Sequence, residues 1–420
     1  MSESDATPRE SGDKSAVLTG ARGSAAVSWN AVLSTYLPAL VLAVGNGIAL
    51  PAVPALAKSF EVSFGVASGV VTAFLLGNLA ITIPSGWLID RFGRRVVLIG
   101  GPLLTSAIAF MVAVAHSFPE LLVLRFFDGC AAQMWLMGRL AAISHGAAPG
   151  QRGRLVSWMF GMNSLGSLTG PILGGFIASA WGARAPFVAY GVLALLALIP
   201  TAALAEDTPR RDRDVRAKEV STRSLSLRQI VMPRLVYFGV ALFAGLTRGP
   251  VQAGLLHLYA AFAYHLGPRE IGYLATGAAC LSLPIGFTGG WMMDRFGRKR
   301  TMVPGFVGVT FAMAALAASA FLHLSLAWYV VLFLLGVALQ ALTGGSIQTV
   351  GADVAPPEAR GTFLGLWRFT GQGGNALSPI MFALLADGVN YGSAFLFIAV
   401  SAATVAFLLI RFVPETRRVG

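Results

Sequence analysis

The sequence predicts an all-helical membrane protein with twelve transmembrane helices in two pseudo-symmetric halves of six. Hydrophobic residues make up 55% of its 420 residues and charged residues only 12%, whereas soluble domains carry about 25% charged residues. Twelve apolar segments follow one another, and most exceed the roughly 20 residues that a helix needs to cross a bilayer. A ten-residue sequence at 86–95 recurs at 290–299, 204 positions later. Together these features predict a duplicated membrane domain.

The predicted elements divide the chain into five regions. Residues 1–28 are polar and lack an apolar signal core, which predicts a disordered tail. The first half, 29–205, contains predicted spans at 30–57, 65–89, 95–116, 119–148, 154–180 and 184–205. A linker at 206–233, rich in Arg and Asp, separates it from the second half, 234–413, and a short tail covers 414–420. The second half contains predicted spans at 234–264, 270–293, 301–322, 326–353, 361–387 and 391–412.

Further matches between the halves support the duplication. The pattern Pro149-x-x-Arg152-Gly153 recurs as Pro357-x-x-Arg360-Gly361, and Glu206 after the sixth span matches Glu415 after the twelfth. Repeated halves of this kind are typical of secondary transporters, whose halves rock around a central site.

The basic residues predict the orientation. If both termini are cytoplasmic, 24 of the 31 Lys and Arg residues fall on the cytoplasmic side and 3 on the other side. This is a strong positive-inside bias. It accounts for the net charge of +12 without a nucleic-acid partner. Cys130 and Cys280 both lie in apolar runs, so neither a disulfide nor a metal site is expected.

Three motifs resemble signatures of the major facilitator superfamily. The sequence at 86–95 resembles the signature of its loop between spans two and three. Leu124-Arg125-Phe126, followed by Gly129, resembles its span-four signature. The glycines and proline at 166–175 resemble a span-five signature of proton-coupled exporters, although Ser157 stands where that pattern begins with glycine. The resemblance covers nearly the whole chain. It implies a twelve-span alternating-access transporter similar to the drug/proton antiporter branch.

The repeated loops are candidates for a cytoplasmic gate. An Asp at each position can accept hydrogen bonds from basic side chains and from a neighbouring helix N-terminus. The resemblance implies that this contact closes the inward side and is released when the halves rock. The alternative is that the basic residues only fix the topology. The gate residues are expected to be Gly86, Asp90, Arg91, Gly93, Arg94 and Arg95, with Asp294, Arg295, Gly297 and Arg298 in the second copy.

The fourth span carries charges on one face. At about 100° per residue around the helix axis, Asp128 lies about 60° from Arg125, and Arg139 lies about 40° from Arg125. Charges inside a membrane are costly and are functional candidates by default. Asp128 is the only acid deep within a span. We therefore predict proton coupling by Asp128, Arg125 and Arg139, and the resemblance implicates Arg125 independently. The alternative is a structural Arg125–Asp128 pair one turn apart.

The fifth span contains small residues at a spacing of four. Such stripes let helices approach closely, and a proline within them bends the helix. We expect a pliable seal where the two halves meet, and the alternative is tight packing only. The hinge residues are Gly166, Gly170, Pro171, Gly174 and Gly175.

Polar and aromatic residues of several spans predict a substrate cavity suited to amphipathic organic molecules. The two arginines in the second half could attract an anionic substrate, or they could bind helix C-terminal carbonyls. The predicted lining is Asn46, Trp135, Asn163, Arg248, Gln252, Gln340, Arg368 and Gln372.

The sequence thus predicts proton-coupled export of drug-like or metabolite-like compounds by a monomer in the bacterial cytoplasmic membrane. The predicted partners are a small organic substrate, protons and the lipid bilayer. No nucleotide-binding or catalytic motif occurs, so neither an enzyme activity nor a cofactor is expected. Two alternatives stay open: an uptake symporter for a small organic acid or another nutrient, and a non-transporting sensor with the same fold.

Overall fold

The computed structural model describes residues 36–146, 152–204, 227–252, 254–356 and 359–415. All regular elements within these ranges are helices. The first half contains α2 (Leu37–Ala49), α3 (Ala52–Lys58), α4 (Phe64–Phe92), α5 (Arg94–Val114), α6 (Phe118–Gly146), α7 (Arg152–Trp181) and α8 (Ala185–Leu204). The second half contains α10 (Leu227–Val231), η2 (Met232–Arg234), α11 (Leu235–Gln252), α12 (Leu255–Ala263), α13 (Pro268–Phe296), α14 (Arg298–Phe321), α15 (Leu326–Leu342), α16 (Ser346–Val354), α17 (Arg360–Gly388) and α18 (Tyr391–Phe412).

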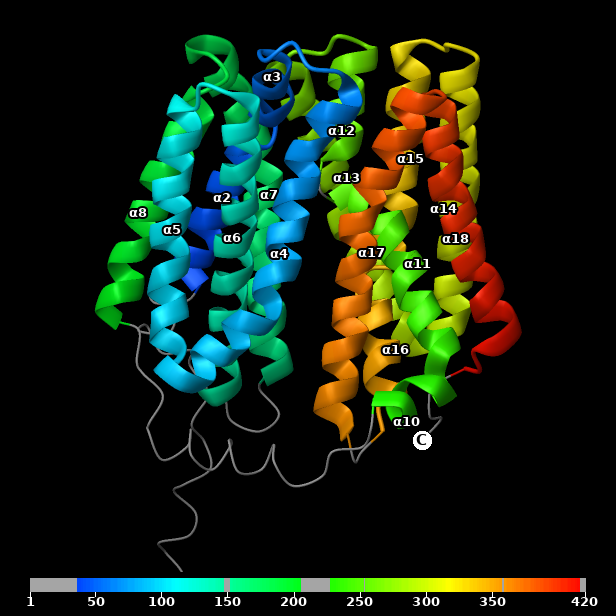
Figure 1. Ribbon diagram of the computed structural model, residues 1–420. Helices are drawn as coiled ribbons and strands as arrows, with labels where there is room; N and C mark the ends of the chain where they lie inside the picture. Colours follow the sequence, from blue (N-terminus) through cyan, green and yellow to red (C-terminus); the bar gives the residue numbers. More distant parts are fainter. Residues whose placement is uncertain (1–35, 147–151, 205–226, 253, 357–358, 416–420) are drawn as a thin grey trace, which may run out of the picture.

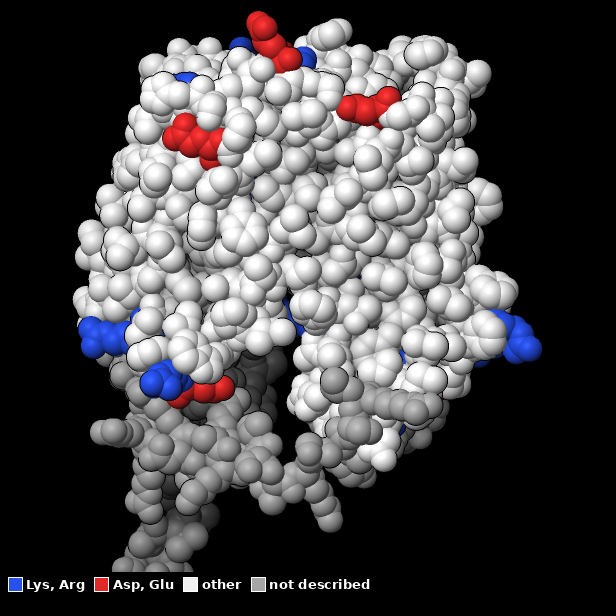
Figure 2. All heavy atoms as spheres, viewed as in Figure 1, with Lys and Arg blue, Asp and Glu red and all other residues white. Residues whose placement is uncertain are grey.

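The helices form two bundles side by side (Figure 1). Ten helical segments of the described chain are long and apolar enough to cross a membrane. The two other long helices, α7 and α17, are rich in glycine and lie where the halves meet, with α7 against α13 and α17 against α4. The surface between the two ends of the molecule shows almost no charged residues in this view (Figure 2). These features confirm the predicted all-helical membrane fold.

Three predicted spans are broken rather than continuous. The first divides into α2 and α3 at Pro51, which has no N–H to donate to the helix ladder. The seventh divides into α11 and α12 next to Gly254, and the tenth into α15 and α16 at Gly345. Gly254 has a φ of 83° and Gly345 a φ of 77°, a left-handed conformation that glycine adopts without a steric penalty.

The two ends of the bundle differ in charge. Helices α4, α13 and α18 all finish at the same end (Figure 1). We call it the basic end, because it carries Arg91, Arg94, Arg95, Arg295, Arg298, Lys299, Arg300 and Arg411. Between the halves, the molecular surface is hollowed at this end (Figure 2).

The opposite end, which we call the closed end, joins the two halves by polar contacts. Lys58 Nζ donates to the Ala261 carbonyl at 2.6 Å. The Asp387 carboxylate on α17 accepts a hydrogen bond from Ser63 Oγ at 2.8 Å and one from the Gly65 N–H at 2.9 Å. Asp387 thereby caps the N-terminus of α4, where an anion is favoured by the helix dipole.

Aromatic rings seal the same end. Phe64 of the first half packs against Phe262, Phe382 and Tyr391 of the second half, with ring centroids 5.1 to 5.9 Å apart. The described molecule is therefore closed at one end and open at the basic end.

Candidate functional site

A cavity of about 210 Å³ lies within the first half, many times the space that one water molecule needs. Residues from α2, α4, α5, α6, α7 and α8 line it. It contains Asn46, Trp135 and Asn163, as the sequence predicts, and their amide and indole groups alternate with other aromatic surface. Phe160, whose aromatic surface the sequence also suggests for the cavity, lines it as well. Other lining residues were not predicted, among them Phe74, Asn78, Gln133 and Tyr190.

Close contact between α4 and α6 brings the charged face of α6 toward the cavity. A side chain at Gly77 would collide with the Phe126 carbonyl, and one at Gly129 would collide with the Phe74 carbonyl. Both glycines therefore allow the two backbones to approach, as small residues do between membrane helices.

Arg125 and Asp128 form the predicted ion pair on α6. Arg125 Nη1 lies 2.5 Å from Asp128 Oδ2, and the two residues are only 9% and 4% exposed. The other carboxylate oxygen, Oδ1, has no hydrogen-bond partner. The guanidinium of Arg125 lies 4.7 Å from the ring centroid of Phe74, which lines the cavity. The pair is therefore one aromatic ring away from the cavity, and it keeps one oxygen free to take a proton.

Arg139 lies apart from that pair. It is 11 residues further along α6, which corresponds to about 16 Å of helix rise. Its side chain is 5% exposed and lines the cavity. The three charges share one face of the helix, but Arg139 lies at a different depth from the Arg125–Asp128 pair.

The two arginines predicted in the second half occupy different surroundings. Arg248 is buried, and its Nη2 donates to the Thr343 carbonyl at the C-terminus of α15, at a distance of 2.6 Å. Arg368 is exposed and has no hydrogen bond among the described residues. Neither of them lines the first-half cavity.

The predicted amides of the second half are also separate from this cavity. Gln340 is buried, and neither atom of its amide has a hydrogen-bond partner. Gln372 Oε1 accepts a hydrogen bond from Asn375 Nδ2 at 2.7 Å. The side chain of Gln252 lies outside the described part of the chain.

The glycine stripe on α7 packs mainly within the first half. Side chains at Gly166, Gly170 and Gly174 would all collide with α2. Only Gly175 and Pro171 meet the second half, where Gly175 faces Pro268 and the Pro171 carbonyl faces Gly272. The expectation that the whole stripe seals the two halves is therefore corrected. Most of it joins α7 to α2, and its last turn alone faces α13.

The two repeated loops at the basic end share their conformation. Gly93 and Gly297 connect the flanking helices with φ of 91° and 103°, values that favour glycine. Arg91 stacks on Trp87, and Arg295 stacks on the equivalent Trp291.

The acids of both loops are free in this open arrangement. Asp90 and Asp294 are exposed, and neither has a hydrogen bond or ion pair among the described residues. A side chain added at Gly86 would meet nothing within 4 Å. The gate contact that we predict is therefore not made in this conformation.

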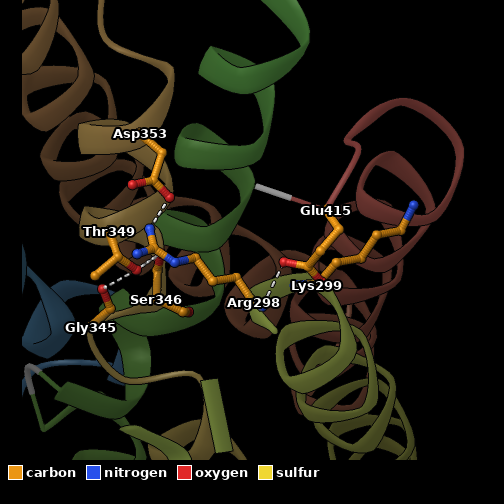
Figure 3. Close-up of polar contacts among 7 residues, drawn as sticks. All are labelled: Arg298, Lys299, Gly345, Ser346, Thr349, Asp353 and Glu415. Carbon is orange, nitrogen blue, oxygen red and sulfur yellow. Dashed lines mark hydrogen bonds and ion pairs between the residues drawn. The ribbon is translucent and has the colours of Figure 1, made fainter. Parts of the chain in front are cut away.

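The second loop has additional partners that the sequence did not predict (Figure 3). Arg298 pairs with Asp353 of α16. The Glu415 carboxylate accepts hydrogen bonds from the N–H groups of Arg298 and Lys299, at 2.8 and 3.1 Å. Lys299 Nζ donates to the Ile410 carbonyl. The position of Glu415 in the repeat was the only sequence signal for this helix cap.

In the first loop, by contrast, Arg95 Nη2 donates to the Ala202 carbonyl at 3.1 Å.

Comparisons with known proteins agree with this architecture. The family model described as Major Facilitator Superfamily matches residues 35–251 and again residues 238–420. The chain belongs to this superfamily. It is a multi-pass membrane transporter, and the two matches correspond to its two halves.

The quinolone resistance protein NorA of Staphylococcus aureus is 25% identical over 249 residues, covering 58% of this chain and 61% of NorA. The chloramphenicol resistance protein CraA of Acinetobacter baumannii is 30% identical over 156 residues, covering 37% of this chain and 38% of CraA. The chain thus spans about three fifths of NorA and less than two fifths of CraA.

A solved structure of a D-xylose–proton symporter has the same fold. It superposes with a TM-score of 0.75 at 19% identity, covering 92% of this chain and 98% of the symporter. A bacterial homologue of the human lysosomal transporter Spinster superposes with a TM-score of 0.67 at 17% identity, covering 92% of this chain and 96% of the homologue.

Proposed function

We propose that this transporter exports organic compounds from the cytoplasm through the first-half cavity, in exchange for protons. The observation that carries the proposal is the buried Arg125–Asp128 pair beside the cavity wall. Protonation of Asp128 would cancel its charge and weaken its hold on Arg125. Because Arg125 rests on Phe74, such a change would reach the cavity through one ring.

Alternating access follows from the contacts between the halves. To open the closed end, the molecule must break the contacts of Lys58 and Asp387 with the opposite half. Helices α4 and α17 run antiparallel, since Asp387 near the end of α17 meets the start of α4. Closure of the basic end would therefore bring Asp90, at the end of α4, toward the N-terminus of α17. We infer that Asp90 caps α17 there, as Asp387 caps α4 here.

We infer that the basic end faces the cytoplasm, because Lys and Arg are retained on that side of bacterial membranes. The resistance proteins NorA and CraA support export. Cysteines introduced one at a time into 210–225 should stay unlabelled by an impermeant maleimide on intact cells. Labelling there would contradict this orientation.

A second candidate is uptake of an organic acid together with a proton. The observation that favours it is Arg139, a buried cation of the cavity without an ion-pair partner among the described residues.

Transport into inverted membrane vesicles separates the two candidates. With exchange, an acidic vesicle interior should drive accumulation of a substrate from a compound panel, and nigericin should abolish it. With uptake symport, an acidic exterior should drive the accumulation instead. Accumulation that is equal with and without a pH gradient would contradict both.

A further inference from the structure

We propose that the first-half cavity binds aromatic organic anions, carboxylates or sulfonates, and that Arg139 binds their acidic group. This inference rests on the proposed function, because it takes the cavity to be the site through which the substrate is transported. It adds the charge class of the substrate and assigns Arg139 to substrate binding instead of proton coupling.

The guanidinium of Arg139 has unused hydrogen-bonding capacity. Its side chain is 95% buried, and neither Nε nor Nη1 has a hydrogen-bond partner. An unpaired charge is costly away from water, so such groups are normally paired or bound to a ligand. A carboxylate that accepted a hydrogen bond from either N–H group would give Arg139 a charge-assisted partner.

The other intramembrane arginines provide an internal comparison. Arg125 is paired with Asp128, Arg248 donates to a helix carbonyl, and Arg368 is exposed. Among these four described arginines, Arg139 alone is buried without an acid or carbonyl partner.

The residues that line the cavity carry positive charge only. Its lining includes Arg139 and no Asp or Glu. The nearest acid along α6 is Asp128, about 16 Å away by helix rise and already paired with Arg125. An anionic ligand would therefore meet attraction at Arg139, with little direct repulsion from Asp128 over that distance. A cationic ligand would instead be repelled by Arg139.

The aromatic part of the ligand class follows from the surroundings of Arg139. Its guanidinium carbon lies 3.7 Å from the ring centroid of Trp135, so the planar group packs on the indole. Phe74, Phe160 and Tyr190 add aromatic faces to the same cavity. The indole N–H of Trp135 also has no partner, so it could donate to the same acidic group.

Binding of three matched probes to the purified full-length protein in a neutral detergent tests the charge class. The probes are 1-naphthoate, methyl 1-naphthoate and 1-naphthylmethylammonium, which share their rings and differ in charge. We expect 1-naphthoate to bind about tenfold or more tightly than the ester, the value of one charge-assisted contact. The ammonium probe should bind most weakly. Equal binding of acid and ester, or tighter binding of the ammonium, would overturn the inference.

Variants then test the residue. Arg139→Gln should remove the preference for the acid over the ester, and Arg139→Lys should keep part of it. Arg411→Gln is the matched control, because Arg411 is an exposed arginine on α18, far from α6 in the sequence. This variant should bind the probes like the wild type. A full acid preference in Arg139→Gln would show that another group binds the anion. If Arg139→Gln does not fold, the wild-type probe ranking and Arg139→Lys still decide the matter.

The binding assay uses no proton gradient, so its result does not depend on whether the proposed proton-coupled export is correct. Acid-selective binding without gradient-driven transport would sustain the anion site and refute proton-coupled exchange. If the protein exports a neutral compound in response to a proton gradient but shows no preference for the acid probe, proton-coupled exchange is supported and the anion site is refuted.

Discussion

The two halves can be compared arginine by arginine, because they share one repeated scaffold. In the second half, Arg248 donates to the Thr343 carbonyl, and Arg298 pairs with Asp353. In the first half, Arg139 has no ion-pair partner among the described residues, and Asp128 keeps one carboxylate oxygen unpaired there. Arg248 and Arg298 thus have partners within their own half, whereas the buried charged groups of the first half keep unpaired atoms. We infer that the first half binds the substrate and the proton, and that the second half acts mainly as its mechanical partner.

The repeated loops show the same difference. The N-terminus of α14 is capped by Glu415 and its Arg298 is held by Asp353. At the position equivalent to Asp353, the first half has His145. The second loop is therefore tied to its own half by carboxylates. A duplicated motif can thus make structural contacts in one copy that its own sequence does not reveal.

The largest expected effect is that of Asp128→Asn, which mimics a permanently protonated acid. Accumulation of substrate against its gradient should be lost, while exchange of labelled for unlabelled substrate should persist at substrate concentrations high enough to offset weaker binding. In the wild type, apparent affinity should rise with pH, because substrate binds the deprotonated carrier, and this dependence should vanish in Asp128→Asn. Vesicle transport at several pH values measures both quantities. A merely structural pair would instead give poor expression, restored by neutralising Arg125 as well.

A smaller effect is expected from the loops. Asp90→Asn should lower the transport rate about tenfold or more, the value of one lost charge-assisted hydrogen bond, with expression near normal. Asp294→Asn should be milder, because Glu415 and Asp353 already hold the second loop. Initial rates at matched protein levels measure both. A native rate for Asp90→Asn would leave the loops with a topological role only.

The smallest effect concerns stability and compares two buried arginines. Arg248→Gln should lower the free energy of unfolding by about 1–3 kcal/mol, because it removes a charge-assisted hydrogen bond to the Thr343 carbonyl, which then keeps only its bonds from Ser346. Arg139→Gln should leave stability unchanged or raise it, since Arg139 has no ion pair among the described residues that the substitution could remove. Melting temperatures in one detergent compare them. A larger loss for Arg139→Gln would indicate that Arg139 supports the fold.

Periodicity and composition predicted the parts of this structure that depend on local sequence. The Arg125–Asp128 pair follows from residues three apart on a helix, and the repeat follows from direct comparison of the two halves. Contacts between distant residues could not be predicted in this way. The Thr343 carbonyl lies 95 residues from Arg248, and the stripe on α7 gave no indication that its partner is α2. Helical angle also placed Arg139 with Asp128, although their separation along the axis puts them in different sites.

The central claim is that Asp128 in the first half carries the coupled proton. The most direct test is to count protons released when a transported substrate binds to the purified protein in weakly buffered detergent solution. We expect release by the wild type and by Asp294→Asn, and none by Asp128→Asn at equal substrate occupancy. Release by Asp128→Asn equal to that of the wild type would show that another group carries the proton.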